Sequence, residues 1–575
     1  MSLNRRMPGW AWPLAGLLVV VLLAGSLSWP RLRQAMHAWT GEDKASEQVK
    51  GTVALLLSRL TQPALDLAPY TPIRYADECP YGVNTFLEQE VEPAKVARSL
   101  DMVRAAGFHF VRQEFPWEDI EISAKGDFWD HKWNVSAWAK YDRIVEMANE
   151  RGLELIVRLD RPPAWSHPAA AAGSYGPPDR LEDFGDFVAA VVSRYRGKVR
   201  YYQIWNEPNI YPEWGEGPVD AAAYTRLLQE AYRRAKAADP DCVILSAGLA
   251  PTLEKGPRNL SDLTYLQQMY DAGARGYFDI MGVMAYGLWT GPTDHRLGPE
   301  RTNFARPQLI RAIMVRNGDA DKPIWAMEIG WNAQPPDLPA PPSFGRVSRE
   351  VQARYAVDAY KRAQAEWPWM GTLNYWFLKR ATDSEKSQPF YYFNLLEPDF
   401  TPWPAYTALQ DYMTAPAPLY AGYHQESHWT LHYSGPWQSL KDASAVLGGY
   451  RRGEAGASLT FSFWGSELDL VTYGPADPAA LAATIDGRPV RARAAGPTAL
   501  ALFRGASPGL HSVEIRVAAG HSLAVDGVIV RPTDRRGLYA LVGLAVAAAA
   551  AGAAFAIGRR RRGRPGITLW KRQDP

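Results

Sequence analysis

Short apolar runs alternate with longer stretches of helical periodicity over most of the chain. The runs have the length of β-strands and lie at residues 82–86, 109–115, 154–160, 199–205, 243–247, 279–286, 324–329 and 372–377. Between them, apolar residues recur at helical spacing at about 93–106, 137–150, 182–195, 221–236, 263–271, 304–316 and 347–364. Strands that alternate with helices form parallel β/α units. Eight such strands predict an α/β fold, a (β/α)8 TIM barrel, over residues 76–415.

The pattern changes after a proline-containing linker at residues 413–421. Only short predicted strands follow, at residues 459–464, 468–473, 482–485, 500–503, 511–517 and 528–530. Asp486 and Gly487, which follow one of these strands, are typical of a tight hairpin turn. Strands without intervening helices predict a separate β-sandwich accessory module over residues 420–532.

A long apolar stretch near the start of the chain is a candidate membrane segment. Residues 9–29 are nearly free of charge and carry tryptophans near both ends. They predict a transmembrane helix or signal anchor within residues 1–30. Small residues at 24–26 leave a cleaved signal peptide open as the alternative.

A second apolar stretch lies near the other end. Residues 537–557 predict a C-terminal transmembrane helix, and four arginines at 559–562 follow it at once. Basic residues favour the cytoplasmic side, so residues 558–575 are expected to form a cytoplasmic tail of a cell-membrane protein. The chain between the two spans would then be extracytoplasmic. Residues 31–75, with a possible helix near 47–60, are expected to form a juxtamembrane stalk.

The composition is that of a globular protein rich in tryptophan. Of 575 residues, 47% are hydrophobic, 22% are charged and 22 are Trp. Indoles stack on the apolar faces of sugar rings, although most are expected to fill the core. The net charge is +2, and nine basic residues near the ends leave a mildly acidic body, which argues against a nucleic-acid partner. The two cysteines, Cys79 and Cys242, are predicted on opposite sides of the barrel as buried thiols without a disulfide.

Two of the predicted strands end in a glutamate. The run at residues 201–209 reads Tyr-Tyr-Gln-Ile-Trp-Asn-Glu-Pro-Asn, and it breaks at Pro208 directly after Glu207. The run at residues 323–331 reads Pro-Ile-Trp-Ala-Met-Glu-Ile-Gly-Trp and places Glu328 at the corresponding end of a later strand. The carboxyl ends of barrel strands carry the active site in this architecture. Two carboxyl groups at that rim are the minimum that hydrolysis of a glycosidic bond requires.

The sequence around these glutamates resembles the retaining glycoside hydrolases of clan A. Trp-Asn-Glu-Pro, followed at a distance by Met-Glu-Ile-Gly-Trp, is similar to their acid/base and nucleophile strands. The family 39 type and its cellulase-like relatives are the nearest resemblance. It implies that Glu207 is the acid/base and Glu328 the nucleophile of a double displacement, with carboxyls about 5 to 5.5 Å apart.

The resemblance implies substrate-binding roles at four further positions. Arg112 matches a second-strand arginine that holds the nucleophile ionised, and Asn206 matches an asparagine that binds the sugar 2-hydroxyl. Tyr286 and Trp376 fall where the clan often has a tyrosine beside the nucleophile and a tryptophan platform under the sugar. Each also has an ordinary structural interpretation, as a surface ion pair for Arg112 or as core for the two aromatics.

The chain departs from the family 5 branch of the clan at two strands. The sixth reads Met-Ala-Tyr at residues 284–286 where those enzymes often have His-x-Tyr, and the third ends Leu-Asp-Arg at 159–161 without a histidine. These departures leave the exact family and the substrate open. They do not affect the assignment of the two glutamates.

The predicted function is a membrane-anchored retaining glycoside hydrolase that cleaves β-glycosidic bonds of a cell-surface or extracellular polysaccharide or oligosaccharide. The alternative is a non-catalytic glycan-binding surface protein on the same barrel, because fold does not fix function. The expected partners are the carbohydrate and, through two spans, the membrane. No cofactor is predicted, and no metal, because His131, His167 and His295 lack partner spacing.

Overall fold

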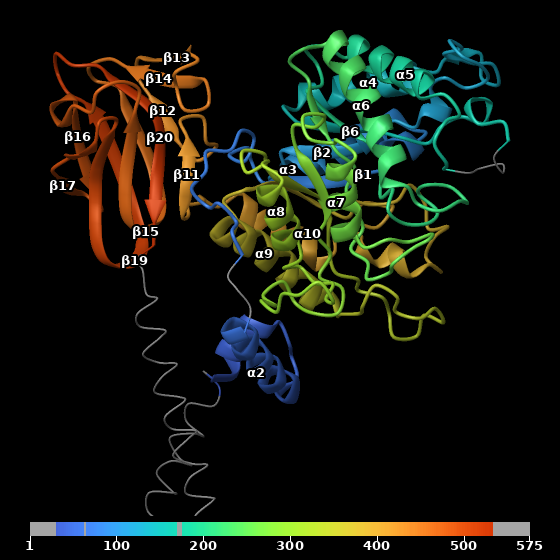
Figure 1. The fold of residues 1–575 in the computed structure, drawn as a ribbon, viewed down its shortest axis with the longest axis horizontal. Helices are drawn as coiled ribbons and strands as arrows, with labels where there is room; N and C mark the ends of the chain where they lie inside the picture. Colours follow the sequence, from blue (N-terminus) through green and yellow to red (C-terminus); the bar gives the residue numbers. More distant parts are fainter. Residues whose placement is uncertain (1–29, 31, 62–64, 170–174, 533–575) are drawn as a thin grey trace, which may run out of the picture.

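The computed structural model describes residues 30, 32–61, 65–169 and 175–532 (Figure 1). The two predicted transmembrane segments, 9–29 and 537–557, and the tail 558–575 lie outside the described residues. Among the helices of the described part, none combines the length and the apolar character needed to cross a membrane.

Eight parallel strands form the barrel, which confirms the predicted α/β architecture. They are β1 (Tyr81–Thr85), β2 (Phe110–Glu114), β5 (Glu154–Leu159), β6 (Tyr201–Ile204), β7 (Val243–Leu245), β8 (Met281–Met284), β9 (Ile324–Ile329) and β10 (Met370–Tyr375). Strand β1 pairs with both β2 and β10. Parallel bridges from Leu245 to Ile280 and from Leu249 to Val283 join the remaining two edges, β7 and β8, so the barrel closes.

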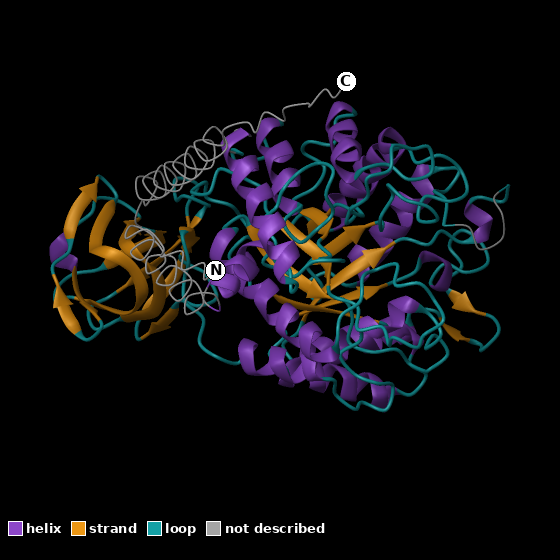
Figure 2. Ribbon diagram, turned by 90° about the horizontal axis from the view of Figure 1, so that it is seen from below, coloured by secondary structure: helices purple, strands orange, loops and turns teal. Residues whose placement is uncertain are grey.

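Helices follow the strands and surround the barrel (Figure 2). They are α3 (Pro93–Ala105), α4 (Ala139–Glu150), α5 (Leu181–Arg194), α6 (Ala221–Ala238), α7 (Asp262–Asp271), α8 (Pro307–Arg316), α9 (Arg349–Glu366) and α10 (Pro404–Met413). The Asp220 carboxylate caps α6 by accepting from two backbone N–H groups, and the Ser348 hydroxyl caps α9. The sequence pattern predicts all of these helices except α10, a short helix that ends where the proline-containing linker begins.

An aromatic layer fills the barrel at the N-terminal end of its strands. The rings of Phe110, Tyr201 and Trp325 lie 5.0 to 5.5 Å apart between centroids. The Trp325 indole donates to the carbonyl of Tyr75, which lies just before β1, at 2.9 Å. The layer closes this end of the barrel, as side-chain layers do in such folds. A polar site is therefore accessible only from the C-terminal ends of the strands.

The C-terminal module is an antiparallel β-structure with its own core. Two long strands, β15 (Ser458–Thr472) and β19 (Ala499–Val517), pair along most of their length, and β20 (Leu523–Arg531) pairs with β15. The shorter strands are β11 (Gly422–Gln425), β12 (His432–Ser434), β13 (Trp437–Lys441), β14 (Gly449–Gly453), β16 (Leu481–Ile485), β17 (Arg488–Val490) and β18 (Arg493–Gly496). The module fits the predicted β-sandwich.

The strand boundaries differ from the sequence prediction in β15 and β19. The sequence pattern predicts two strands in the place of each, whereas the structure has one continuous strand with shifts of register. One shift in β15 lies between Gly465 and Glu467. A β-bulge bends a strand without ending it, so a local break in the apolar pattern does not mark a strand end here.

The module contacts the barrel at the N-terminal ends of the barrel strands (Figures 1 and 2). Asp77, four residues before β1, accepts a hydrogen bond from the backbone N–H of Gln425 at 2.5 Å. Arg74 donates to the carbonyl of Leu447 at 3.0 Å. The module therefore lies at the opposite end of the barrel from the rim that carries Glu207 and Glu328.

The segment that precedes the barrel is docked on it. Helix α2 spans Ala45–Thr61, which agrees with the possible helix near 47–60. Just before it, Glu42 pairs with Arg296 at 2.6 Å, and the carbonyl of Gly41 accepts from the N–H of Gly291 at 3.0 Å. This part of the predicted stalk is held against the loop that follows β8. The two cysteines are free; Cys242 is buried, whereas Cys79 is only half-buried.

Candidate active site

Glu328 lies in β9, one residue before its C-terminal end, and Arg112 lies in the middle of β2. The Arg112 Nη1 donates to Glu328 Oε1 at 2.9 Å. The side chains are 2% and 7% exposed. A charge pair removed from water to this degree is stable only with good geometry and further hydrogen bonds.

Arg112 makes those further bonds to three other side chains. Its Nε donates to Gln203 Oε1 at 2.7 Å, its Nη1 also donates to Asn84 Oδ1 at 2.7 Å, and its Nη2 donates to Asn206 Oδ1 at 2.8 Å. Asn84 is in β1, Gln203 is in β6, and Asn206 follows β6. The guanidinium thus joins strands from around the whole barrel and fixes the position of the Glu328 carboxylate.

Tyr286 holds the other oxygen of Glu328. It follows β8, and its hydroxyl donates to Glu328 Oε2 at 2.5 Å. Burial, together with the negative charge of Glu328, raises the pKa of Tyr286 well above its ordinary value, so the phenol keeps its proton and remains a donor. Glu328 thus accepts one hydrogen bond on each oxygen, and one of the two donors is a cation.

Glu207 lies in a turn directly after β6. Trp205 and Glu207 both have positive φ, 72° and 38°, which is uncommon for residues other than glycine. The N–H of Glu207 donates to the carbonyl of Gly248 at 3.2 Å, and the indole of Trp205 donates to the carbonyl of Glu213 at 2.8 Å. Such backbone conformations persist where the surrounding structure over-determines them, and they concentrate at functional sites.

The environment of Glu207 favours its protonated form. Burial is the largest cause that raises the pKa of Glu207 well above its ordinary value. The negative charges of Glu328 and then Glu213 add to this effect, and Arg112 opposes it. The site therefore pairs a carboxyl held by two hydrogen-bond donors with a carboxyl whose pKa is raised, which is the kind of pairing that acid/base chemistry needs.

Trp376 lies at the same rim but outside the hydrogen-bond network. It directly follows β10, and its backbone N–H donates to the carbonyl of Ile329, the residue after Glu328, at 2.8 Å. Its half-buried ring makes an edge contact with Phe86 at 5.4 Å between centroids. The structure thus brings the five positions Arg112, Asn206, Tyr286, Glu207 and Glu328 into one interacting group and leaves Trp376 beside it.

Sequence reasoning missed two members of the group, Asn84 and Gln203. Both are polar residues inside otherwise apolar strands, and both are buried. A buried amide must find hydrogen-bond partners. Their presence in strand interiors was therefore a signal of an internal polar network.

A second charged network lies next to the first, at the C-terminal ends of β2 and β5 and in the loop that follows β5. Arg158 pairs with Glu114 and Asp160, and Arg161 pairs with Glu114. Burial opposes ionisation of Glu114, but the two arginines outweigh it and hold its pKa at about 2. Burial raises the pKa of Asp160 to about 8. Glu114 and Asp160 are buried, so this network extends the charged interior of the rim.

The barrel, with Glu328 held by Arg112 and Tyr286 and with the pKa of Glu207 raised at the same C-terminal rim, has the arrangement of a glycoside hydrolase. Residues 76–262 match the family model "Cellulase (glycosyl hydrolase family 5)". The match confirms the resemblance to the retaining glycoside hydrolases of clan A and the prediction of an O-glycosyl hydrolase. It covers the first half of the barrel, including Glu207 but not Glu328.

The chain is also similar to solved structures of low sequence identity. One is a family 39 glycoside hydrolase from Bacteroides cellulosilyticus, with a TM-score of 0.45 and 18% identity, covering 77% of this chain and 82% of that chain. Another is a family 39 β-xylosidase from Caulobacter crescentus, with a TM-score of 0.40 and 15% identity, covering 79% of this chain and 99% of that one. A search of curated proteins finds no match.

Neutralising Glu328 should lower the pKa of Glu207. The variant Glu328→Gln removes the nearby negative charge and leaves the positive charge of Arg112, and both changes favour ionised Glu207. Burial remains, so the pKa should stay above its ordinary value. Carboxyl ¹³C NMR titration, assigned by loss of the signal in Glu207→Gln, measures the change. Glu213→Gln is the matched control and should give a smaller decrease. An unchanged Glu207 pKa in Glu328→Gln would show that the two carboxyls do not interact.

Proposed function

We propose that this chain is a membrane-anchored retaining glycoside hydrolase in which Glu328 is the nucleophile and Glu207 the acid/base. The observation that carries the proposal is the asymmetry of the two carboxyls. Glu328 accepts hydrogen bonds from Arg112 and Tyr286, whereas the pKa of Glu207 is raised by burial and by Glu328 itself.

In the first step, Glu328 attacks the anomeric carbon while Glu207 gives its proton to the glycosidic oxygen. The bond between carbon and leaving oxygen breaks through an oxocarbenium-like state, and a covalent glycosyl-enzyme forms. In the second step, Glu207 takes a proton from water as the water attacks the same carbon. Glu328 leaves, and the product keeps its original configuration.

The surrounding residues have supporting roles in this proposal. Arg112 holds the nucleophile ionised and turned toward the sugar. Asn206 is fixed by Arg112 at 2.8 Å, and it is proposed to bind the sugar 2-hydroxyl through its amide N–H. Tyr286 orients Glu328, and Trp376 provides an apolar platform, because sugar rings stack on indoles.

The proposed substrate is a β-linked polysaccharide or oligosaccharide at the cell surface. Resemblance to clan A supports the β linkage, and the two apolar stretches outside the described residues support the location. Helix α2 adds to the argument about location. Its residues Val49, Val53 and Leu56 lie one turn apart and are 44%, 51% and 45% exposed. An apolar helix face in water is unfavourable, and a membrane interface would cover it.

Substitution of the two glutamates tests the mechanism. Glu328→Ala should leave almost no turnover, because no other group forms the covalent intermediate. In Glu207→Ala, the turnover rate on substrates with poor leaving groups should fall roughly 10²- to 10⁴-fold, which is the usual contribution of positioned proton transfer. Glu300→Ala, at an exposed position in the loop after β8, is the control and should keep full activity. Normal turnover by Glu328→Ala would refute the assignment.

The stereochemistry of the product tests the same mechanism independently. In Glu207→Ala, an activated aryl glycoside needs no proton for departure, so added azide should restore turnover and give a glycosyl azide of retained configuration. NMR of the first-formed wild-type product should show the retained anomer. An inverted anomer would exclude the double displacement.

The substrate class is tested with the purified extracytoplasmic part on polysaccharides and aryl glycosides of both anomeric forms. We expect turnover only of β-linked substrates, and higher activity on a surface polysaccharide than on short glycosides. Activity confined to α-glycosides or to a cytosolic metabolite would contradict the proposal. Loss of activity in Glu328→Ala distinguishes true turnover from a contaminating enzyme.

The proposed topology is tested by protease treatment of intact cells. Residues 31–535 should be cleaved from outside, and an epitope added after residue 575 should survive until the cells are lysed. A cytoplasmic reporter protein serves as the control for cell integrity. Digestion of the C-terminal epitope with survival of the barrel would reverse the orientation.

A further inference from the structure

A second group of chemically active side chains lies at the junction between the barrel and the module. Asp77 comes from the segment that enters β1, and His424 and His428 come from the start of the module. One ligand atom of each lies within 4.8 Å of those of the other two. This group is at the end of the barrel opposite Glu328.

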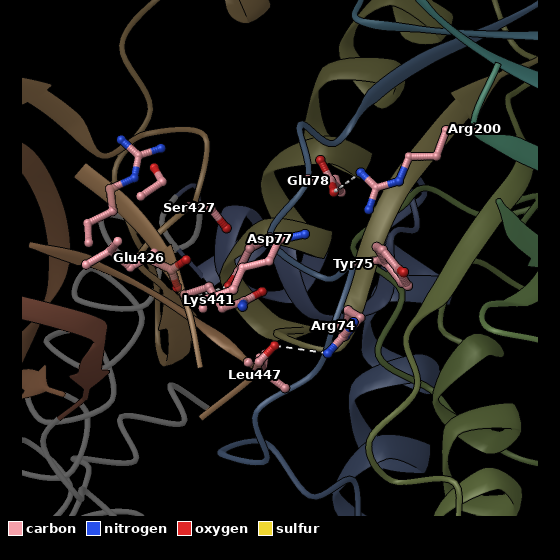
Figure 3. Close-up of a pocket in the computed structure, with 15 residues that line it drawn as sticks. Arg74, Tyr75, Asp77, Glu78, Arg200, Glu426, Ser427, Lys441 and Leu447 are labelled. Carbon is pink, nitrogen blue, oxygen red and sulfur yellow. Dashed lines mark hydrogen bonds and ion pairs between the residues drawn. The ribbon is translucent and has the colours of Figure 1, made fainter. Parts of the chain in front are cut away.

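Two cavities meet at Asp77. It lines a cavity of about 510 Å³ between barrel and module, together with Glu78 and Glu426 (Figure 3). It also lines a smaller cavity of about 50 Å³ with both histidines. Asp77 therefore borders space that an incoming ion can enter.

Two oxygen atoms contact the His424 ring, which satisfies them either as an imidazolium that donates to both or as a neutral ring beside a metal ion. Its Nε2 lies 2.8 Å from the carbonyl oxygen of Tyr420, and its Nδ1 lies 3.2 Å from Asp77 Oδ1. A neutral imidazole has only one N–H, so it cannot donate to both oxygens. When Nε2 donates to the carbonyl, the Nδ1 lone pair points at Asp77. A metal-binding histidine typically has this arrangement, with the second nitrogen bonded to a backbone carbonyl.

Hydrogen bonds also fix the orientations of Asp77 and His428. Asp77 Oδ2 is held by the N–H of Gln425 at 2.5 Å, which leaves Oδ1 toward the histidines. His428 Nε2 lies 3.8 Å from Asp77 Oδ1. The backbone N–H of Thr430 donates to its Nδ1 at 3.2 Å, and the Thr430 hydroxyl lies 2.9 Å from the same atom. These contacts orient Nε2 toward Asp77. As a metal ligand through Nε2, the neutral ring would carry its proton on Nδ1 and donate it to the Thr430 hydroxyl.

Glu426 provides an independent indication of a missing partner. The residue is only 8% exposed, and its Oε2 atom is buried without a hydrogen-bond partner among the described residues. It lines the same cavity as Asp77. Buried carboxylate oxygens are normally satisfied, so this one is expected to gain a ligand.

We propose that Asp77, His424 and His428 bind a divalent transition-metal ion, with Zn²⁺ preferred, that cross-links the module to the barrel. Two imidazoles and a carboxylate are a ligand set that suits Zn²⁺. The fourth tetrahedral position is left for water or Glu426. Because the ligands come from segments about 350 residues apart, the ion would bind only when the two parts are docked. The inference does not rest on the proposed glycosidase function.

Metal content and Co²⁺ substitution test the site in the full chain. The protein is purified in detergent with a tag free of histidine, and elemental analysis should find about one equivalent of Zn²⁺ per chain. After chelation, added Co²⁺ should give the visible absorption of a low-coordinate nitrogen and oxygen site. Zn²⁺ should also raise the unfolding temperature of the chelated protein, because it binds only the folded state.

Matched variants distinguish metal binding at this site from metal binding by other histidines. Asp77→Asn keeps the side-chain shape, and His428→Ala removes one ligand. Each should weaken Co²⁺ binding by more than the roughly 10- to 100-fold that loss of an outer partner costs. His432→Ala, at an exposed position in the same module, should bind as the wild type does. Circular dichroism checks that each variant is folded. The proposal would be overturned if the metal-free wild-type protein gave no absorption with added Co²⁺. It would also be overturned if folded variants bound Co²⁺ as the wild type does.

Discussion

The buried ion pair between Arg112 and Glu328 is the interaction on which the rest of the site depends. Moving a guanidinium from water into the barrel costs several kcal/mol, and a single carboxylate does not repay this. Asn84, Gln203 and Asn206 each add an acceptor within 2.8 Å; Asn84 is in β1, Gln203 is in β6, and Asn206 follows β6. The same bonds that stabilise the charge therefore hold the rim of the barrel together around Glu328.

This arrangement explains how two glutamates at one rim come to have different surroundings. Glu328 has a cation and a phenol as direct partners, so its negative charge is stabilised. Glu207 follows its strand in a positive-φ turn and is affected by the charge of Glu328 without sharing its partners. Because like charges close together cannot both be favourable, ionisation of one favours the proton on the other. The positions of Arg112 and Tyr286 thus determine that Glu328, and not Glu207, is the carboxyl with these two hydrogen-bond donors.

The sequence was sufficient to predict the barrel and both glutamates, because each lies at the end of an apolar run of strand length. It was insufficient for Gln203, whose role depends on which strands lie opposite each other across the closed barrel. It was also insufficient for Asp77 and His424, which are 347 residues apart. No spacing rule relates side chains over such a distance, and only docking of the module on the barrel brings them together. Local pattern thus predicts elements, whereas contacts between distant elements need the tertiary fold.

The two ends of the barrel are separated by its own core. The layer of Phe110, Tyr201 and Trp325 fills the interior at the N-terminal end, so no path leads through the barrel from the module to Glu328. The module contacts described here, including Arg74 with Leu447, all involve that end. A module in this place lies away from the rim where the sugar is proposed to bind. Any effect of the module on activity would therefore act through its contacts with the N-terminal end of the barrel.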